Sequence, residues 1–479
     1  MTKPDSTPLR LDWGTAPALD AFEALMWRMD VYPNLRSSVV GVEILDRAPD
    51  RARVIAAHRW GANAVPRLRD RLVDVPLATP EWVADTNFDL DTHLEFVRLP
   101  SPGSERQLLD HAARFAMAPF DRTRPPWQAQ VIEGLEGGQA AYLLKLHHAL
   151  SDGIGIVQLM SFMHSRAREP SGRAKVPPPE QTGRDVETST LGIWRGRLRR
   201  ELAAAPMRAK ALLGTGRTLL AASADGEPLL SRAARYAASA RRALAPYMAP
   251  PSPLLKDRSH EWRFEVLDLP LAPFKAAAKA CKATLNDAFI AGLLGGFARY
   301  HEELGVDARE LPIGMPINVR SADAGGGGNH FAPGQLAGLL NGATPIERMR
   351  HISEQVARLR DEPALAAPLA LMPLLARLPP SVVAKAMGPK MAANDLQISN
   401  VPGMRDTVYL AGARVTRLYP FAPLPGVAGM ITLVSHGEYC CIGLNLDARA
   451  VAEPARLMRC LRASFDEVLA LAPAAATKA

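Results

Sequence analysis

The strongest constraint on the fold of this chain is a largely apolar run, Ala140 to Leu146, followed by His147-His148-Ala149-Leu150-Ser151-Asp152-Gly153. A run of this length predicts a buried strand. The Ser-Asp-Gly that follows predicts a turn, and Ile154 to Met160 then predicts the start of a helix. A histidine at the end of a core strand is held rigidly and titrates near neutral pH, as a general base must.

Other roles for this segment are weaker. His147, His148 and Asp152 carry metal-ligating groups, but adjacent strand residues point to opposite faces, so both histidines cannot bind one ion. No other His/Cys cluster lies nearby in the sequence, and we predict no metal. Ser151 lacks the Gly-x-Ser-x-Gly elbow of a serine nucleophile. A lone histidine among apolar residues is more often a satisfied core group than a catalyst, so the rest of the chain must decide.

Strand and helix patterns alternate in both halves of the chain, which predicts the α/β fold class. In the second half, strands are expected at Phe264 to Leu269, Leu311 to Val319 and within Gly429 to Leu446. A helix is expected from Leu271 to Ala283, and Thr284 is a suitable N-cap for another from Asn286 to Tyr300. Gly325 to Gly328 lacks the Lys-Ser/Thr of a phosphate-binding loop and predicts only a loop.

The positive charge of the chain is concentrated in one stretch. Residues 195–242 hold eleven Lys or Arg against three Asp or Glu, an excess as large as the net charge of +8. Proline-rich segments flank this stretch, and its Ala/Leu content predicts helices. It fits a solvated basic linker between domains, or a contact of residues 193–242 with an anionic membrane or lipid-body surface. Nucleic-acid binding is not predicted, because aromatic content is low and no recognised motif occurs.

Length and composition are consistent with a large protein of the cytoplasm. A chain of 479 residues can form more than one domain. No apolar core follows the first residues, as a signal peptide requires, and the longest apolar runs fall short of the ~20 residues of a bilayer span. We therefore expect a cytoplasmic protein that is soluble or peripheral on membranes or lipid droplets. Four cysteines are too few and too oddly placed for a disulfide framework, namely Cys281, Cys440, Cys441 and Cys460.

Several ordered motifs extend this picture. The His147 to Gly153 motif resembles that of the bacterial wax ester synthase/diacylglycerol acyltransferase family, within the CoA-dependent acyltransferases that use an HxxxD base. Further stretches are similar to family motifs and occur in the same order: Pro119 to Trp127, Leu285-Asn286-Asp287, Met315 to Arg320, Gly328 to Phe331, and Ser399 to Gly403. Within the first of these stretches, Pro126 stands where the family usually has leucine. The resemblance runs from about Asn87 to about Asp447 and is weaker over the first eighty-odd residues.

The resemblance implies both a fold and an activity. It implies two similar domains, each a mixed sheet flanked by helices, with a tunnel at their interface. We place the N-terminal domain at residues 1–175, the basic helical linker at 176–258 and the C-terminal domain at 259–479. The implied reaction moves a long-chain acyl group from acyl-CoA to diacylglycerol or a fatty alcohol, forming triacylglycerol or a wax ester. Acyl-CoA is a substrate, and no cofactor is expected.

The motif that carries the base suggests separate roles for its residues. His148, at the catalytic position of the superfamily, is the expected base, with His147 beside it. Asp152 is expected to hold the loop and the imidazole tautomer, and Arg320 is the candidate partner for its charge, because an unpaired buried carboxylate is costly. Gly153 would allow a backbone bend or a close approach.

Other residues are candidates for substrate binding. The oxyanion of the tetrahedral intermediate needs a donor, and Asn286, Ser399 and Asn400 are the candidates. Asp287 fits a structural role at a helix N-terminus. Pro126 and Trp127 are expected to pack beneath the site or to line the acyl path. The apolar segment from Ala364 to Met387 predicts either helical core or a wall of the acyl channel.

Two alternatives remain at this stage. One is a condensation-type acyltransferase that takes its acyl group from a carrier protein. The motifs at Leu285 to Asp287 and Ser399 to Gly403 favour the wax ester and triacylglycerol branch instead. The other is a non-catalytic lipid-binding homologue. A broken motif would mark such a protein, but His148, Asp152 and Gly153 are all present.

Overall fold

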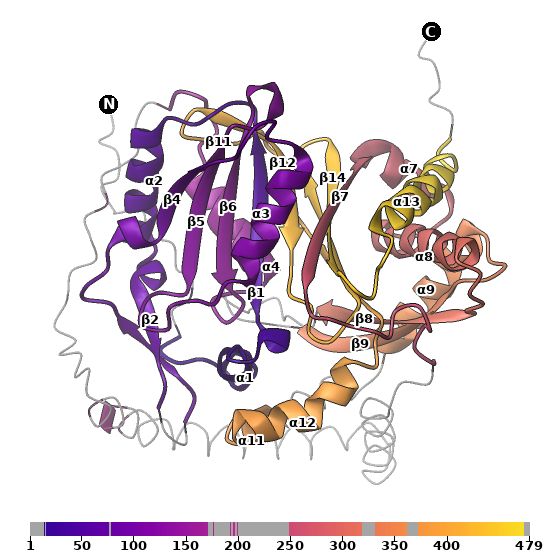
Figure 1. Cartoon of the computed structure of the whole chain (residues 1–479), viewed down its shortest axis with the longest axis horizontal. Coiled ribbons are helices and arrows are strands. Elements are labelled where there is room, and N and C mark those ends of the chain that lie inside the picture. The colour runs from indigo at the N-terminus through magenta and orange to yellow at the C-terminus, as the bar shows by residue number, and fades with distance from the viewer. Residues whose placement is uncertain are drawn as a thin grey trace, which may run out of the picture.

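A computed structural model describes residues 16–75, 78–170, 249–318, 331–361 and 372–473, together with a few isolated positions. Two six-stranded sheets lie side by side in this part of the chain, and helices pack on them (Figure 1). A separate ribbon is formed by β2 (Asp70–Val73) and β3 (Glu81–Ala84). The predicted α/β class is confirmed.

The first sheet has the strand order β11-β12-β1-β6-β5-β4. β4 runs parallel to β5, and the other neighbours are antiparallel. All eight residues of β6 are buried, as its apolar sequence predicts. The bounds of these strands are β1 (Ser38–Leu45), β4 (Leu94–Arg98), β5 (Trp127–Glu133), β6 (Ala140–His147), β11 (Tyr409–Leu410) and β12 (Ala413–Phe421).

Helices cover both faces of the first sheet. α2 (Arg51–Ala64) and α4 (Gly153–Met163) share a buried cluster with Leu144 and Leu146 of β6. α3 (Glu105–Met117) packs on the opposite face, against Leu143. Short 3₁₀ helices complete this half, at η1 (Pro33–Leu35), η2 (Pro66–Arg69), η3 (Leu90–Thr92) and η4 (Glu136–Gly138). This layering confirms the predicted strand–turn–helix from β6 into α4.

The second sheet has the order β7-β14-β13-β10-β8-β9, with β10 parallel to both β13 and β8. Its other neighbours are antiparallel. The predicted strands of the second half are all present, and the Gly429 to Leu446 segment forms the hairpin β13–β14. The bounds are β7 (Trp262–Pro270), β8 (Glu310–Asn318), β9 (Phe331–Leu339), β10 (Leu396–Val401), β13 (Gly429–His436) and β14 (Tyr439–Asp447).

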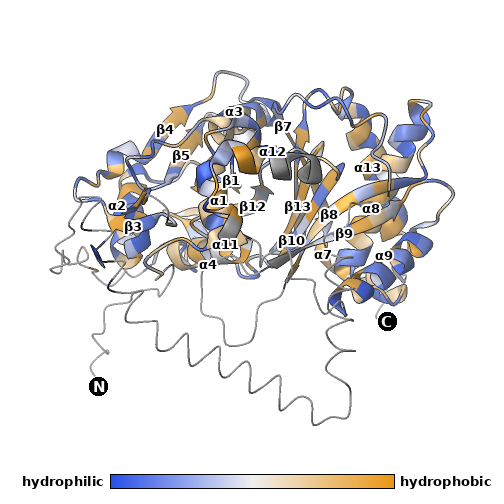
Figure 2. Cartoon of the chain, turned by 90° about the horizontal axis from the view of Figure 1, so that it is seen from below, coloured by the Kyte–Doolittle hydropathy of each residue, from blue (hydrophilic) through white to orange (hydrophobic). Residues whose placement is uncertain are grey.

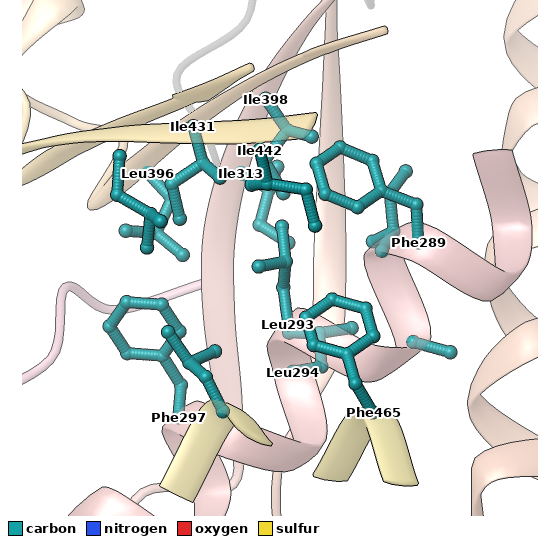
Figure 3. Close-up of a cluster of buried hydrophobic side chains, with 14 of the residues drawn as sticks. Phe289, Leu293, Leu294, Phe297, Ile313, Leu396, Ile398, Ile431, Ile442 and Phe465 are labelled. Atoms are coloured by element: carbon teal, nitrogen blue, oxygen red, sulfur yellow. The ribbon is translucent and has the colours of Figure 1, made fainter. Parts of the chain in front are cut away.

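A thick apolar core lies between the second sheet and its helices. Phe289 and Phe297 of α8 and Phe465 of α13 meet the aliphatic side chains of the strands (Figure 3). Thr284 and Asp287 form a capping box that starts α8, which confirms the predicted N-cap and a structural role for Asp287. The helices are α7 (Leu271–Ala280), α8 (Leu285–Glu303), α9 (Pro345–Arg360) and α13 (Pro454–Leu469).

The chain crosses from one sheet to the other late in the sequence. β11 and β12 follow β10 in the chain, yet β12 pairs with β1 and completes the first sheet. The two sheets also pack on each other, because Phe264 of β7 stacks on Phe421 of β12 with ring centroids 3.8 Å apart. The limits placed at residues 175 and 258, and the tunnel, stay predictions. Residues 193–242 lie almost wholly outside the described residues.

Three helices form a smaller layer below the sheets. α1 (Ala21–Met29) packs against α11 (Met372–Leu375) and α12 (Pro380–Met391). Met372 and Val383 are buried against Leu25 and Met29, so these two residues of the predicted apolar segment lie in helical core. Its first residues, 364–371, lie outside the described part of the chain. No helix among the described residues is long and apolar enough to cross a membrane.

The contact between the sheets yields a stability prediction. A Cβ atom added at Gly443 of β14 would lie 2.0 Å from the carbonyl oxygen of Pro420 on β12. We expect Gly443→Ala to force the strands apart and to lower stability by about 1–3 kcal/mol, seen as a lower thermal midpoint. Gly388→Ala is the control, because nothing lies within 4 Å of its added Cβ inside α12. Equal midpoints for Gly443→Ala and wild type would contradict close packing here.

Candidate active site

The motif after β6 folds into a short hydrogen-bonded turn. The N–H of Leu150 donates to the His147 carbonyl at 2.9 Å. Asp152 is the N-cap of α4, and its Oδ1 accepts the Gly155 N–H at 2.9 Å. Ser151 is fully buried, which argues against a nucleophilic hydroxyl. Asp152 therefore fixes the turn to the helix start, a loop-holding role of the kind expected for it.

His147 is an internal anchor of the turn. Its side chain is fully buried and makes edge-on (T-shaped) contacts with the rings of Trp27 and Phe120. Its Nδ1 accepts the N–H of Ala149 at 3.0 Å, so Nε2 is the nitrogen that can donate. Nε2 lies 3.5 Å from Oδ1 of Asp30. This first histidine is held by a hydrogen bond at Nδ1, has Nε2 near the Asp30 carboxylate and does not face solvent.

Asp30 joins both histidines to the start of the first sheet. Its Oδ1 accepts the Ser37 N–H at 2.8 Å, and the Ser37 carbonyl accepts the His148 N–H at 2.8 Å. Burial alone would raise the pKa of Asp30, but its interaction with the His147 ring and the hydrogen bond from the Ser37 N–H hold it below its usual value. Sequence analysis missed Asp30, because it lies far from the motif in the chain and no local pattern links them.

His148 occupies a different environment from its neighbour. It is half-buried, whereas His147 is fully buried, as expected for adjacent residues at a strand end. Its backbone is fixed by Ser37, and the turn that follows is fixed by Asp152. The imidazole of His148 is thus mounted on a rigid backbone while remaining partly open to a reactant. This combination suits a general base.

The turn also meets the motif that ends β10. A Cβ atom at Gly153 would lie 2.9 Å from Cγ2 of Val401, so the close approach expected at this glycine is to a strand of the other sheet. Gly153 does not have a positive φ angle, and no unusual bend is needed there. Ser399 is half-buried and Asn400 is exposed on the same short strand. The structure therefore brings the Ser399 to Gly403 motif beside the histidine turn.

Two further candidates belong to the support beneath the turn. The carbonyl of Pro126 accepts the His147 N–H at 3.0 Å. Trp127 is buried, donates from Nε1 to the Leu68 carbonyl at 2.7 Å and stacks on His93. Both residues hold the end of β6 from the neighbouring strand. Their position supports the first of the roles expected for them, packing beneath the site.

Two further candidates are Asn286 and Arg320. Asn286 is half-buried at the start of α8, which packs in the C-terminal core, whereas the turn packs in the cluster around α4. Arg320, the proposed partner of Asp152, lies outside the described residues. Among the residues that are described, no three potential metal ligands gather in one place.

A buried lysine lies on β6, two residues before His147. Lys145 of β6 is fully buried, and its Nζ donates to the Ala118 carbonyl at 2.6 Å and sits over the Phe120 ring. Burial lowers the pKa of Lys145 to about 8, although the Asp30 carboxylate opposes this shift. The interior next to His147 thus holds a cation and a carboxylate, which compensate each other in part.

Comparison with known proteins identifies the family. The model of the wax ester synthase/diacylglycerol acyltransferase catalytic domain matches residues 21–289, and that of the WS/DGAT C-terminal domain matches residues 328–468. The chain belongs to this family. A Mycobacterium tuberculosis protein named "Putative diacyglycerol O-acyltransferase" is 37% identical to this acyltransferase over 464 residues, covering 95% of it and 92% of the relative.

Solved structures agree on the fold of the acyltransferase. The wax ester synthase/diacylglycerol acyltransferase from Marinobacter aquaeolei VT8 matches with a TM-score of 0.64 and 22% identity, covering 95% of this chain and 99% of that one. The first condensation domain of the calcium-dependent antibiotic synthetase matches with a TM-score of 0.59 and 15% identity, covering 97% and 99%. At these identities the likeness establishes the two-domain α/β fold.

The Asp30 contacts predict a pH-dependent effect on stability. Because its pKa is lowered from the usual 3.8, the stabilisation by its carboxylate is present above pH 3.8 and lost as pH falls through the folded value. We expect Asp30→Asn to lower the free energy of unfolding by about 1–3 kcal/mol at pH 7, with a smaller difference at pH 3. Chemical denaturation at both pH values measures it. Asp91→Asn, at an exposed site, is the control. If Asp30→Asn lowered the free energy of unfolding equally at both pH values, the stabilisation would not come from the charged carboxylate.

Proposed function

We propose that this acyltransferase moves a long-chain acyl group from acyl-CoA to diacylglycerol or a long-chain alcohol, with His148 as the general base. The observation that carries the proposal is the half-open imidazole of His148 on a backbone fixed by Ser37 and Asp152. The family assignment supports the reaction class. The names of the relatives, diacylglycerol O-acyltransferase and wax ester synthase, support both acceptors.

In the proposed reaction, His148 takes the proton of the acceptor hydroxyl as its oxygen attacks the thioester carbonyl. The tetrahedral intermediate then expels the CoA thiolate by breaking the carbon–sulfur bond. The imidazolium of His148 returns its proton to this thiolate, so that an ester and free CoA leave. No acyl-enzyme is required. General-base catalysis of this kind contributes ~10²–10⁴ in rate.

The surrounding residues would position this base. Asp152 holds the turn on α4, and the Asp30–His147 contact holds it from beneath. Ser399 and Asn400 are the better-placed candidates for the oxyanion donor, because their strand reaches the turn at Val401. Loss of such a donor typically costs ~2.7–4 kcal/mol of transition-state stabilisation. Asn286, half-buried at the start of α8, is the weaker candidate.

The setting of the reaction is also a proposal. Acyl-CoA and a lipid alcohol are the proposed partners, and a cytoplasmic protein peripheral on membranes or lipid droplets would meet both. The basic stretch at residues 193–242 would contribute to that contact by attraction to anionic lipid. The acyl donor separates this proposal from a condensation-type reaction, which uses a carrier-bound acyl group.

The decisive test is CoA release from palmitoyl-CoA with hexadecanol or dioleoylglycerol as the acceptor. We expect turnover by wild type and a ~10²–10⁴-fold lower rate for His148→Ala, since the base is removed. His351→Ala on α9, another half-buried histidine, is the matched control and should keep its rate. Full activity of His148→Ala would refute the mechanism. Turnover only with an acyl-carrier protein as donor would favour the condensation-type alternative.

A further inference from the structure

The exposed large apolar side chains of this protein are unevenly placed. Among the described residues, these side chains are Val31 (59% exposed), Val382 (46%), Ile346 (40%) and Leu378 (37%). Three of them, Val31, Leu378 and Val382, lie on the layer formed by α1, α11 and α12. We call these three residues the apolar ridge. Figure 2, seen from below, shows the three helices grouped together. Exposed apolar groups that gather in this way mark interaction sites, whereas scattered ones do not.

The ridge is anchored to a packed layer. Val31 follows α1 directly, and Val382 is next to Val383, which is fully buried against Leu25 and Met29 of α1. The side chain of Arg28 on α1 donates to the carbonyl of Ala376, between α11 and the ridge. The exposed side chains thus stand on a fixed base.

The charges on the α11–α12 side of the ridge are all positive, whereas on the α1 side Asp30 precedes Val31 and Arg28 pairs with Asp74. Arg377 and Lys385 are exposed beside Leu378 and Val382. The sequence from residue 372 to residue 393 contains no Asp or Glu. Apolar side chains bordered by cations complement a phospholipid surface, in which the acyl boundary lies beneath anionic headgroups.

The ridge is connected to the histidine turn through one short stretch of chain. Val31 is the residue after Asp30, whose carboxylate contacts His147, and Trp27 of the same helix packs against the His147 ring. A surface bound at Val31 would therefore lie next to the support of the active-site turn. This placement suits an enzyme whose acceptor is dissolved in lipid.

We propose that the apolar ridge docks the acyltransferase onto anionic phospholipid surfaces, with Arg377 and Lys385 among the headgroups. Docking would hold the histidine turn close to the lipid phase that contains the acceptor. The binding itself is independent of the proposed function, whereas the benefit to acceptor delivery rests on it. The described helices need not span the bilayer, because the ridge would enter only the interface.

The binding test uses the full chain without substrates. Flotation is measured with vesicles of phosphatidylcholine and phosphatidylglycerol. We expect the triple variant Val31→Ser, Leu378→Ser, Val382→Ser to bind at least about tenfold more weakly than wild type, because the inserted apolar area is lost. Ile346→Ser, which removes the exposed apolar side chain on α9, is the matched control and should bind as wild type. Unchanged binding of the triple variant, or an equal loss in the control, would overturn the proposal.

The charge contribution has its own variant. Arg377→Glu with Lys385→Glu should weaken binding to the anionic vesicles by about tenfold or more. Binding of this variant to vesicles of phosphatidylcholine alone should equal that of wild type. Equal binding of wild type and variant to the anionic vesicles would contradict the placement of these cations at the headgroups.

An activity comparison separates this proposal from the proposed function. The triple variant should release CoA at the wild-type rate with a short, water-soluble alcohol, and more slowly with dioleoylglycerol held in vesicles. Wild-type protein that binds vesicles but never turns over would refute the proposed function and leave the docking surface intact. A triple variant that is as active as wild type on both acceptors would overturn the role of the ridge in acceptor delivery.

Discussion

The contact between Asp30 and His147 is the interaction on which the arrangement of the site depends. A carboxylate this deeply buried must be compensated, and here the Ser37 N–H and the His147 ring compensate it. These contacts join the end of α1, the entry to β1 and the end of β6. They fix α1 beneath the turn, and α11 and α12 then pack on α1. The layer that carries the apolar ridge is therefore joined to the histidine turn through one carboxylate.

The site also needs both halves of the chain. Gly153, at the start of α4, lies against Val401 of β10, so the turn and the Ser399 to Gly403 motif face each other across the two sheets. β12 and β14 hold the sheets together, with the Gly443 backbone close to the Pro420 carbonyl. The proposed base from one half and the candidate oxyanion donors from the other are thus positioned by sheet packing. Reactants that bind between the halves would meet both.

Local patterns predicted the local structure well. The strand–turn–helix around His148, the N-cap at Thr284 and the strands within Gly429 to Leu446 each depend on neighbouring residues, and the sequence contains their signals. The role of Asp30, the approach of Val401 to Gly153 and the passage of β12 into the first sheet were not foreseen. Each joins segments that lie far apart in the chain, where spacing and periodicity carry no information. The pairing of Asp152 with Arg320 stays a prediction.

The late crossing of β12 has a consequence for synthesis of the protein. β1 lies between β6 and β12, so one of its edges has no partner until residues 413–421 leave the ribosome. An unpaired strand edge in an apolar setting invites association with other chains. A fragment cut at the boundary between the halves would keep this open edge permanently. The N-terminal half is therefore a unit of sequence but not a self-sufficient unit of folding.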